Sequence, residues 1–320
     1  MRIINNCTSE AIQRAAHALI DGNLVAFPTE TVYGLGADAS NLSAVSRIYS
    51  VKARPKNHPL IVHISSIDQL EKWSINIPEY AKNLAKVYWP GAITIILKRS
   101  DLAGNEITGG QSAVGIRVPS NQIALELLKE FEKLGGNGVV APSANRFGAV
   151  SPTTSQAVEF ELGDFLGSED LILNGGQCDI GIESTIIDCT ENNPVVLRPG
   201  AVTLEMIRKV IGEKITFGLE IGKTRTSGLL ASHYAPKAKV VLSMPSEEGY
   251  GFIALADIPD PHGSIRLASP KNIEEYAKSL YQALRLGDDI GVKVIFAVKP
   301  DGEGLAMAIR DRLSKAASGR

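Results

Sequence analysis

Short apolar runs alternate with amphipathic stretches along most of the chain. Helical spacing with polar faces marks "TSEAIQRAAHALIDG", "LSAVSRIYSVK", "PEYAKNLAKVYW" and "NQIALELLKEFEKLGG". The first helix is predicted to be capped by Thr8 or Ser9 and stopped at Gly22. Strands are predicted for the apolar runs "LVAF", "LIVHI", "AITIIL", "VGIRV", "GVVA", "LIL", "STIIDC" and "VVLR". This mixture predicts α/β architecture, with some strands near enough in sequence to pair antiparallel.

A change of pattern after "LRPGAV" divides the chain. Residues 1–201 form the first predicted domain. Residues 202–235 hold one helical segment, "TLEMIRKVIG", and then a stretch rich in Gly, Thr and Ser, which predicts a linker. Strand and helix patterns resume from 236 to 320, beginning with "KVVLS" and ending with "GLAMAIRDRLSKAAS". They predict a smaller C-terminal, Rossmann-like α/β domain.

Two predicted strands each place one polar side chain among apolar ones. In "LIVHI", the period of two puts His63 on the face opposite to Leu60, Val62 and Ile64. In "VGIRV", Arg117 faces away from the valines and shares its side with a glycine. One such residue is usually an edge residue or a satisfied core group, but two indicate a lined cavity. A guanidinium there suits a carboxylate or phosphate, because its planar fork makes paired hydrogen bonds.

Polar loops follow several of the predicted strands. "APSANRFGAVSPTT", residues 141–154, is rich in small hydroxyl and amide side chains, and composition alone favours a plain surface loop. The functional interpretation is an anion-holding loop. "GIESTIID" and "VLRPGAV" add hydroxyls and a cation at strand ends, and "SHYAPK" stands where the linker meets the second domain: the residues are Ser184, Thr185, Arg198, His233 and Tyr234.

Two glycine motifs resemble nucleotide-binding signatures without fitting them. "GLEIGKT", residues 218–224, has three residues before its Gly-Lys pair where a P-loop needs four, so it is interpreted as a turn with a basic tip. "GLGADA", residues 34–39, is separated from the preceding strand by "PTETVY", unlike a dinucleotide fingerprint. It is predicted to be a glycine-rich turn that lets the backbone approach a ligand or another strand.

Composition narrows the kind of partner. The net charge is −2, with 44% hydrophobic and 21% charged residues, so anion binding must come from local clusters such as Lys52, Arg54 and Lys56. The three cysteines form no CxxC pair, and no signal peptide or membrane span is apparent, which predicts a cytoplasmic protein without a metal site. Cations and hydroxyls on one side of a sheet suit a nucleoside triphosphate or an RNA backbone, and spacing alone does not separate the two.

The motifs in their order resemble the threonylcarbamoyl-AMP synthase family of YrdC-like proteins. The resemblance covers roughly residues 10–201 and rests on "FPTETVYGLGADA", "KARPKNHPLIVHI", "WPGAITIIL", "VGIRVP", "APSANRFGAVSPTT", "GIESTIID" and "LRPGAV". The later part looks like the long form of that family, with "HYAP" in the linker. The resemblance implies a twisted mixed sheet with flanking helices. It also implies synthesis of threonylcarbamoyl-AMP and pyrophosphate from L-threonine, bicarbonate and ATP with Mg²⁺, as the first step of a tRNA modification.

Site residues follow from the same resemblance, position by position. The implied catalytic set is Lys52, Arg54, Ser143 and Asn145. The ATP-binding side adds His58, Ala113, Ser151, Arg198 and Tyr234. The L-threonine side comprises Thr31, His63, Arg117, Ala141 and Ser184, with Arg117 on the substrate carboxylate.

The chain departs from the family pattern at three places. His58 stands where the family usually has Asn, and Ala113 where it usually has Thr, which leaves only backbone groups there. The linker reads "SGLLASHY" where relatives often have "SPGM" before "HY".

Three functions remain to be compared. The synthase is expected to pass its product to a tRNA threonylcarbamoyltransferase and to make at most a weak contact with tRNA. The alternative is an RNA-binding module that uses the same basic face without catalysis, although no aromatic residues are interleaved among these cations. A carbamoyltransferase accessory protein is the third hypothesis, and the absence of zinc-finger-like cysteine pairs argues against it.

Overall fold

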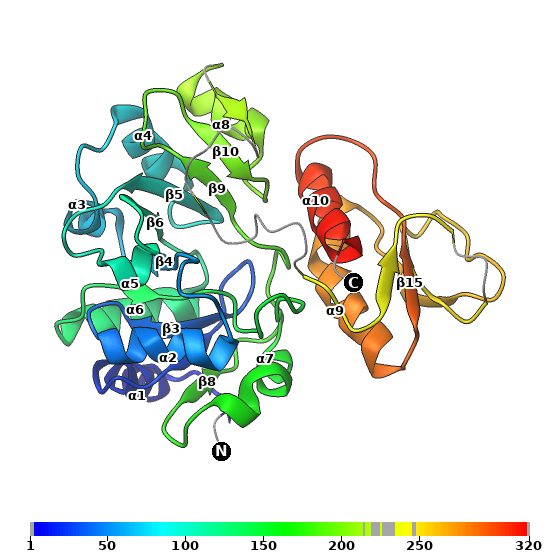
Figure 1. Ribbon diagram of the computed structural model, residues 1–320, viewed down its shortest axis with the longest axis horizontal. Helices are drawn as coiled ribbons and strands as arrows, with labels where there is room; N and C mark the ends of the chain where they lie inside the picture. The colour runs from blue at the N-terminus through cyan, green and yellow to red at the C-terminus, as the bar shows by residue number, and fades with distance from the viewer. Residues whose placement is uncertain (1–2, 214, 219–224, 226–233, 245–247, 319–320) are drawn as a thin grey trace.

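The computed structural model describes residues 3–213, 215–218, 225, 234–244 and 248–318, which form two α/β units (Figure 1). The described strands of the first unit are β1 (Ile3–Ile4), β2 (Val25–Phe27), β3 (Gly34–Asp38), β4 (Ile61–His63), β5 (Ile93–Lys98), β6 (Ala113–Arg117), β7 (Val139–Val140), β8 (Leu171–Leu173), β9 (Thr185–Asp188), β10 (Val195–Arg198) and β11 (Thr216–Phe217). Its described α-helices are α1 (Ser9–Ile20), α2 (Leu42–Lys52), α3 (Leu70–Trp73), α4 (Glu79–Tyr88), α5 (Asn105–Thr108), α6 (Gln122–Lys133), α7 (Ser155–Leu162) and α8 (Leu204–Ile211).

The first sheet is mixed, which confirms the predicted fold class. Its strand order is β1-β8-β2-β3-β7-β4-β6-β5-β9-β10-β11. Parallel pairs such as β4 with β6 and β5 with β9 alternate with antiparallel pairs such as β5 with β6. β4 and β6 lie in the interior of this order. Each therefore has a paired strand on both sides, which fixes the backbone that carries their polar side chains.

Helices cover the two faces of this sheet unequally. Apolar residues of α2, α3 and α4 pack in one large cluster with Leu60, Val62, Val114 and Ile116 of the central strands. On the other face, α1 and α6 pack together over β2 and β8. A small separate cluster, which includes Ile96, Ala113 and Ile186, lies on β5, β6 and β9. The strand alternation predicted for "LIVHI" and "VGIRV" is therefore confirmed on its apolar side.

Two local predictions are wrong. "GLGADA" is mostly strand β3 and not a turn, paired antiparallel with β2 and β7. The predicted close approach does occur, because a Cβ on Gly36 would lie 2.8 Å from the Phe27 ring. The loop 141–154 is mostly buried and is no plain surface loop, since its carbonyls and hydroxyls bond within the fold.

The first part of the predicted linker belongs to the first unit, because it contributes a helix and a strand there. Thr203 caps α8, and β11 pairs parallel with β10 at the edge of the sheet. Within "GLEIGKT", residues 219–224 lie outside the described residues, as does His233, so the structure does not address these predictions.

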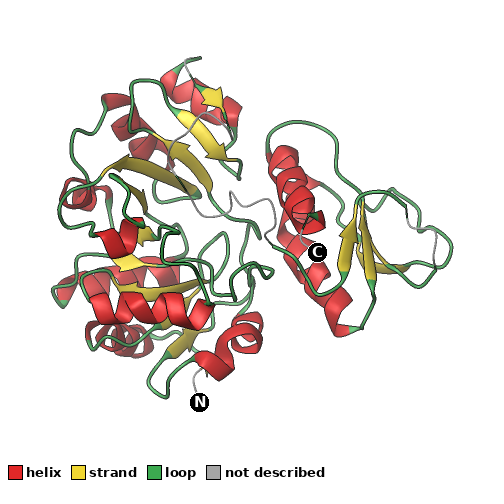
Figure 2. Cartoon of the chain, in the orientation of Figure 1, coloured by secondary structure: helices red, strands yellow, loops and turns green. Residues whose placement is uncertain are grey.

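The second unit is a parallel sheet with two helices, as the sequence predicted. Its strands are β12 (Lys239–Val241), β13 (Gly251–Ile253), β14 (Ile265–Ala268) and β15 (Val294–Ala297), in the order β12-β15-β13-β14. Helices α9 (Ile273–Asp289) and α10 (Leu305–Ala317) lie on the side of this sheet that faces the first unit (Figures 1 and 2). Among the described helices, none is both apolar and long enough to cross a bilayer.

Candidate active site

A small cavity at the interior strands brings together residues from distant parts of the sequence. Its volume is about 50 Å³. It is lined by Thr31, Val32, Arg54, Ile61, His63, Arg117, Ala141, Pro142, Ser143, Glu183, Ser184, Arg198 and Tyr234. All five residues predicted for L-threonine are in this set, together with four of those predicted for ATP.

The wall of the cavity is set by strand register. β4 and β6 pair in parallel with His63 opposite Arg117, so both side chains emerge side by side on the same face. Burial, with a further contribution from Arg117, lowers the pKa of His63 to about 3. Its Nδ1 has no hydrogen-bond partner among the described residues. His63 is therefore a neutral polar group available to a ligand.

Arg117 is held by groups on the β2–β3 connection. Its Nη2 lies 2.6 Å from Oε1 of Glu30, and its Nη1 donates to Oγ1 of Thr31 at 2.9 Å. Nε donates to the carbonyl of Gly91 at 3.2 Å. Sequence reasoning missed Glu30, although a buried arginine requires a counter-charge and Glu30 is the acidic residue next to Thr31. The ion pair orients the guanidinium toward the cavity.

Ser184 and Arg198 form the opposite part of the lining. The Oγ atoms of Ser184 and Thr94 are 2.8 Å apart. Arg198 donates from Nε to the carbonyl of Ser184 at 3.0 Å and from Nη2 to its Oγ at 3.1 Å. Both residues are nearly inaccessible, and burial lowers the pKa of Arg198. The structure thus places a second guanidinium beside the hydroxyl predicted to bind threonine.

Lys52 does not line the cavity, and its ammonium holds the neighbouring loop. Lys52 is the last residue of α2, where Ala53 turns the chain in the left-handed region with φ 49°. Nζ lies 2.5 Å from the carbonyl oxygens of both Ser143 and Asn145. Burial, and to a smaller extent the charge on Arg54, lower the pKa of Lys52. Its placement supports the shape of the 143–145 loop.

Arg54 and His58 lie at one end of the cavity. Arg54 donates from Nη2 to the carbonyl of Pro59 at 2.8 Å, and its guanidinium lies 5.7 Å from the centre of the Phe147 ring. Burial lowers its pKa to about 10, so it stays charged at neutral pH. The His58 ring packs edge-on against Phe147 at 5.2 Å, and burial and Arg54 lower its pKa. Arg54 lines the cavity, whereas His58 is not part of the lining and packs against Phe147.

The remaining predicted residues support the lining from outside. Asn145 donates from Nδ2 to the carbonyls of Arg146 and Ala149, each at 2.8 Å, and so closes its own loop. Ser151 donates to Oε1 of Glu183 at 2.6 Å. Ala113 borders a shallow hollow beside the cavity, together with Thr94 and Gly115. Their assigned roles stay predictions, because their side chains lie beside the cavity and not in its lining.

Tyr234 closes the cavity from the end of the linker. It adopts φ 63° and is almost fully buried. Its ring stacks on Tyr281 of α9, with ring centres 5.7 Å apart. Burial, followed by the charge on Glu183, raises its pKa to about 12. The second unit therefore contributes to the packing of one lining residue.

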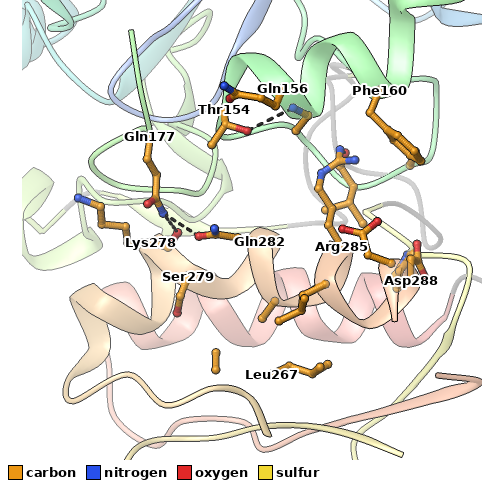
Figure 3. A pocket seen from close by; sticks show the side chains of 18 of the residues that line it. Thr154, Gln156, Phe160, Gln177, Leu267, Lys278, Ser279, Gln282, Arg285 and Asp288 are labelled. Atoms are coloured by element: carbon orange, nitrogen blue, oxygen red, sulfur yellow. Dashed lines mark hydrogen bonds between the residues drawn. The ribbon is translucent and has the colours of Figure 1, made fainter. Parts of the chain in front are cut away.

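A much larger cleft, of about 1060 Å³, lies between α7 and α9 (Figure 3). Arg285 pairs with Glu161 at 2.8 Å, and Lys278 lies 3.9 Å from Asp179. Asp288 accepts the backbone N–H groups of Lys237 and Ala238, each at 2.8 Å. Arg285 and Glu161 are thus paired within the cleft, and none of the predicted site residues lines it.

Comparison with known proteins agrees with the arrangement of the two units. Residues 17–200 match the Sua5–YciO–YrdC family, described as telomere recombination, and residues 202–318 match the Sua5 C-terminal domain, described as threonylcarbamoyl-AMP synthase, C-terminal domain. Among relatives named threonylcarbamoyl-AMP synthase, that of Pyrococcus abyssi is 41% identical over 97% of this chain and 94% of its own length. That of Bacillus subtilis is 39% identical over 97% of this chain and 93% of its own.

A solved structure gives the same result in three dimensions. The structure of P. abyssi Sua5 complexed with L-threonine has a TM-score of 0.88 at 38% identity, covering 99% of this chain and 98% of that one. Family matches to both units, with relatives aligned over nearly the full length, leave no part of the architecture unaccounted for. The chain therefore belongs to the Sua5–YciO–YrdC family, in the form that carries the Sua5 C-terminal domain.

Proposed function

We propose that this protein is a threonylcarbamoyl-AMP synthase, which makes threonylcarbamoyl-AMP and pyrophosphate from L-threonine, bicarbonate and ATP. The observation that carries the proposal is the convergence of His63, Arg117, Ser184 and Arg198 on one buried cavity. Two guanidinium groups, a neutral imidazole and hydroxyls suit a small anionic substrate beside a phosphate. The names of the relatives and the L-threonine in the P. abyssi structure support the same assignment.

L-threonine fits the wall formed by β4, β6 and β9. The fork of Arg117 offers its donors to the substrate carboxylate, while Glu30 keeps the guanidinium in place. His63 is neutral, so it presents a hydrogen-bonding nitrogen without adding charge. Ser184 and Thr31 supply hydroxyls for the polar groups of the amino acid. Specificity then follows from polar groups that would be left unpaired with an amino acid lacking the hydroxyl.

The chemistry needs orientation and charge stabilisation more than a protein nucleophile. The threonine amine adds to the carbon of bicarbonate, and loss of water leaves a carbamate. A carbamate oxygen then attacks the α-phosphorus of ATP, and the bond to pyrophosphate breaks. Arg54 and Arg198, both buried at the cavity, stabilise the negative charge that accumulates during this transfer.

ATP cannot enter a cavity of about 50 Å³ as it stands, since small-molecule sites typically enclose about 300–1,000 Å³. Binding of the nucleotide therefore includes widening of this cavity. The loop at 143–145, whose Ser143 lines the cavity and whose carbonyls accept hydrogen bonds from Lys52, is the part of the wall that the nucleotide is expected to contact.

The part of the chain that the structure describes does not form a cage for Mg²⁺. Among the described residues, no group of three or more His, Cys, Asp or Glu side chains is placed to hold a metal ion. The carboxylates beside the cavity, Glu30 and Glu183, are each paired with an arginine. Mg²⁺ would therefore be coordinated by the ATP phosphates and enter with them.

Burial of Lys52 and Arg54, which leaves only Lys56 of the basic cluster exposed, argues against the RNA-binding alternative. Lys52 and Arg54 are 1% and 7% exposed, and their donors contact carbonyls of the protein. A surface for an RNA backbone requires accessible cations. The tRNA threonylcarbamoyltransferase that takes up the product, and a weak contact with tRNA, remain parts of the proposal.

The test is pyrophosphate release by the purified protein with ATP, Mg²⁺ and bicarbonate. Addition of L-threonine is expected to stimulate release and to yield threonylcarbamoyl-AMP by mass spectrometry, whereas L-valine, which lacks the hydroxyl, is expected to stimulate little. Release that is equal with and without threonine would overturn the proposal. Nucleotide-independent, salt-sensitive RNA binding without turnover would instead favour the alternative.

A further inference from the structure

The second unit packs directly on the segment that carries part of the cavity lining. Gly181, with φ 83°, lies so near α9 that an added Cβ would fall 2.5 Å from Cα of Lys278. Val32, Val150 and Ile182 of the first unit belong to the same buried apolar cluster as residues of α9 and α10. The two units therefore share one core at this place, next to Glu183 and Ser184.

At the centre of this contact, a buried carboxylate accepts hydrogen bonds from both units. Arg312 of α10 donates from Nε to Oε2 of Glu183 at 2.8 Å, and the hydroxyl of Tyr281 donates to the same oxygen at 2.8 Å. Ser151 of the first unit donates to Oε1 at 2.6 Å. Glu183 is 6% exposed and Arg312 is 1% exposed. Both carboxylate oxygens are thus occupied, one by each unit.

Arg312 reaches further into the first unit than one ion pair. Its Nη2 donates to the carbonyl of Pro199 at 3.1 Å, directly after Arg198. Its guanidinium lies 5.4 Å from the ring centre of Tyr234. Nη1 is held by Asp311 at 2.6 Å, which also pairs with Lys315. One side chain of the second unit is therefore in contact with the segments of three cavity-lining residues, Glu183, Arg198 and Tyr234.

The charge balance gives this contact a role at the cavity. Burial by itself would raise the pKa of Glu183, but Arg312 and then Arg198 hold it at about 2, so the carboxylate is ionised. If Arg312 were absent, the cation left beside Glu183 would be Arg198. In the intact protein, the donors of Arg198 bond to Ser184. Loss of Arg312 would draw Arg198 toward Glu183 and away from the substrate side.

We propose that Arg312 is a positioning residue for the synthase site, acting from the second unit through Glu183 on Ser151, Ser184 and Arg198. This inference rests on the proposed function. It assigns the second unit a part in substrate binding, because the geometry of the lining depends on a charge that the first unit does not supply. The competing explanation is that the ion pair only holds the units together.

The test compares Arg312→Gln with Arg266→Gln in the full chain. Arg266 is a matched control, because it pairs with Asp260 at 2.5 Å and lies 4.7 Å from the Phe252 ring, within the second unit alone. Both variants are expected to lower the melting temperature. Arg312→Gln is expected to reduce kcat/KM for threonine and ATP about 10- to 100-fold, mainly through KM, assayed well below its melting temperature. Arg266→Gln is expected to stay within about twofold.

A double variant separates positioning from simple loss of contact. Glu183→Gln combined with Arg312→Gln removes the unpaired buried charge, so it is expected to lose no more activity than Arg312→Gln alone, a non-additive result. Wild-type kinetics in Arg312→Gln, or an equal loss in Arg266→Gln, would overturn the inference while the wild-type protein still makes threonylcarbamoyl-AMP. A wild-type protein that shows no threonine-dependent pyrophosphate release overturns the proposed function, and the inference with it.

Discussion

The two hollows of the molecule differ in a way that their sizes do not reveal. The cavity beside β4 and β6 measures about 50 Å³, and the cleft between α7 and α9 about 1060 Å³. In the small cavity, three guanidinium groups and a neutral imidazole converge from separate segments and face one space. In the large cleft, Arg285 is paired with Glu161, and the lining holds none of the predicted site residues.

The difference shows that convergence of chemical groups identifies a site better than volume does. Arg117 and Arg285 are each paired with a glutamate, at 2.6 and 2.8 Å, with side chains that are 5% and 15% exposed. Arg117 lines the small cavity beside His63, whose Nδ1 has no hydrogen-bond partner among the described residues, and beside further arginines from other segments. The four predictions below test this contrast, from the largest expected effect to the smallest.

The same substitution in the two hollows is expected to change kcat/KM for threonine to very different extents. Arg117→Lys keeps a charge for Glu30 but loses the fork, so kcat/KM for threonine is expected to fall roughly 100-fold, through KM. Arg285→Lys in the large cleft is expected to change kcat/KM less than about twofold. Steady-state pyrophosphate release at varied threonine checks both. Equal losses in the two variants would remove the distinction between the hollows.

Lys52 tests whether the cavity depends on its supporting loop. Lys52→Met removes the ammonium that donates to the carbonyls of Ser143 and Asn145. These carbonyls then lack that hydrogen-bond donor. The free energy of unfolding is expected to fall by about 1–3 kcal/mol, and kcat/KM for ATP by about tenfold. Lys56→Ala, at an exposed position of the same turn, serves as control and is expected to match the wild type. Denaturant titration and ATP kinetics provide the measurements.

His63 makes stability depend on pH in a defined window. Because its folded pKa of about 3 lies below the ordinary histidine pKa of 6.5, the unfolded chain takes up the proton first as pH falls. The contribution of neutral His63 to the free energy of unfolding is therefore fully present above about pH 6.5. It is lost as the pH falls toward 3, which lowers the free energy of unfolding by about 1–4 kcal/mol. His63→Asn is expected to show a shallower loss across this window in urea titrations. An unchanged slope would mean that His63 is not held neutral.

Phe160 provides the smallest expected effect, in the large cleft. It lines that cleft and is 70% exposed. Phe160→Ser is expected to change the free energy of unfolding by less than about 0.5 kcal/mol and to leave both substrate KM values unaltered. A clear change in either KM would instead give the large cleft a role in catalysis.

Much of the fold and part of the site followed from sequence. The period of two in "LIVHI" and "VGIRV" placed His63 and Arg117 away from the apolar core, and both line the cavity. The alternation of side chains along a strand is a local property of the sequence, and interior strands such as β4 and β6 keep it in the folded protein. Strand β3 was missed, because glycine weakens the strand pattern and only contact with Phe27 and Val139 explains Gly36.

The counter-charges show where sequence reasoning ended. Glu30 and Glu183 look like ordinary acidic residues in loops, yet they are buried beside Arg117 and Arg312. Glu183 lies 129 positions from Arg312, so no local pattern connects them. Lys52 was predicted for the catalytic and ATP-binding set, and the path of the 143–145 loop adds that its ammonium contacts two carbonyl oxygens.

By itself, the sequence determined the alternation of strands and helices, the division into two units and the chemical types at the cavity, since each depends on residues close along the chain. Tertiary structure alone decided which strands are neighbours, which charges are neutralised and which are left facing a ligand. Register aligns His63 with Arg117, and docking of α10 brings Arg312 to Glu183. Those outcomes depend on burial and distance between remote segments, which a linear pattern does not encode.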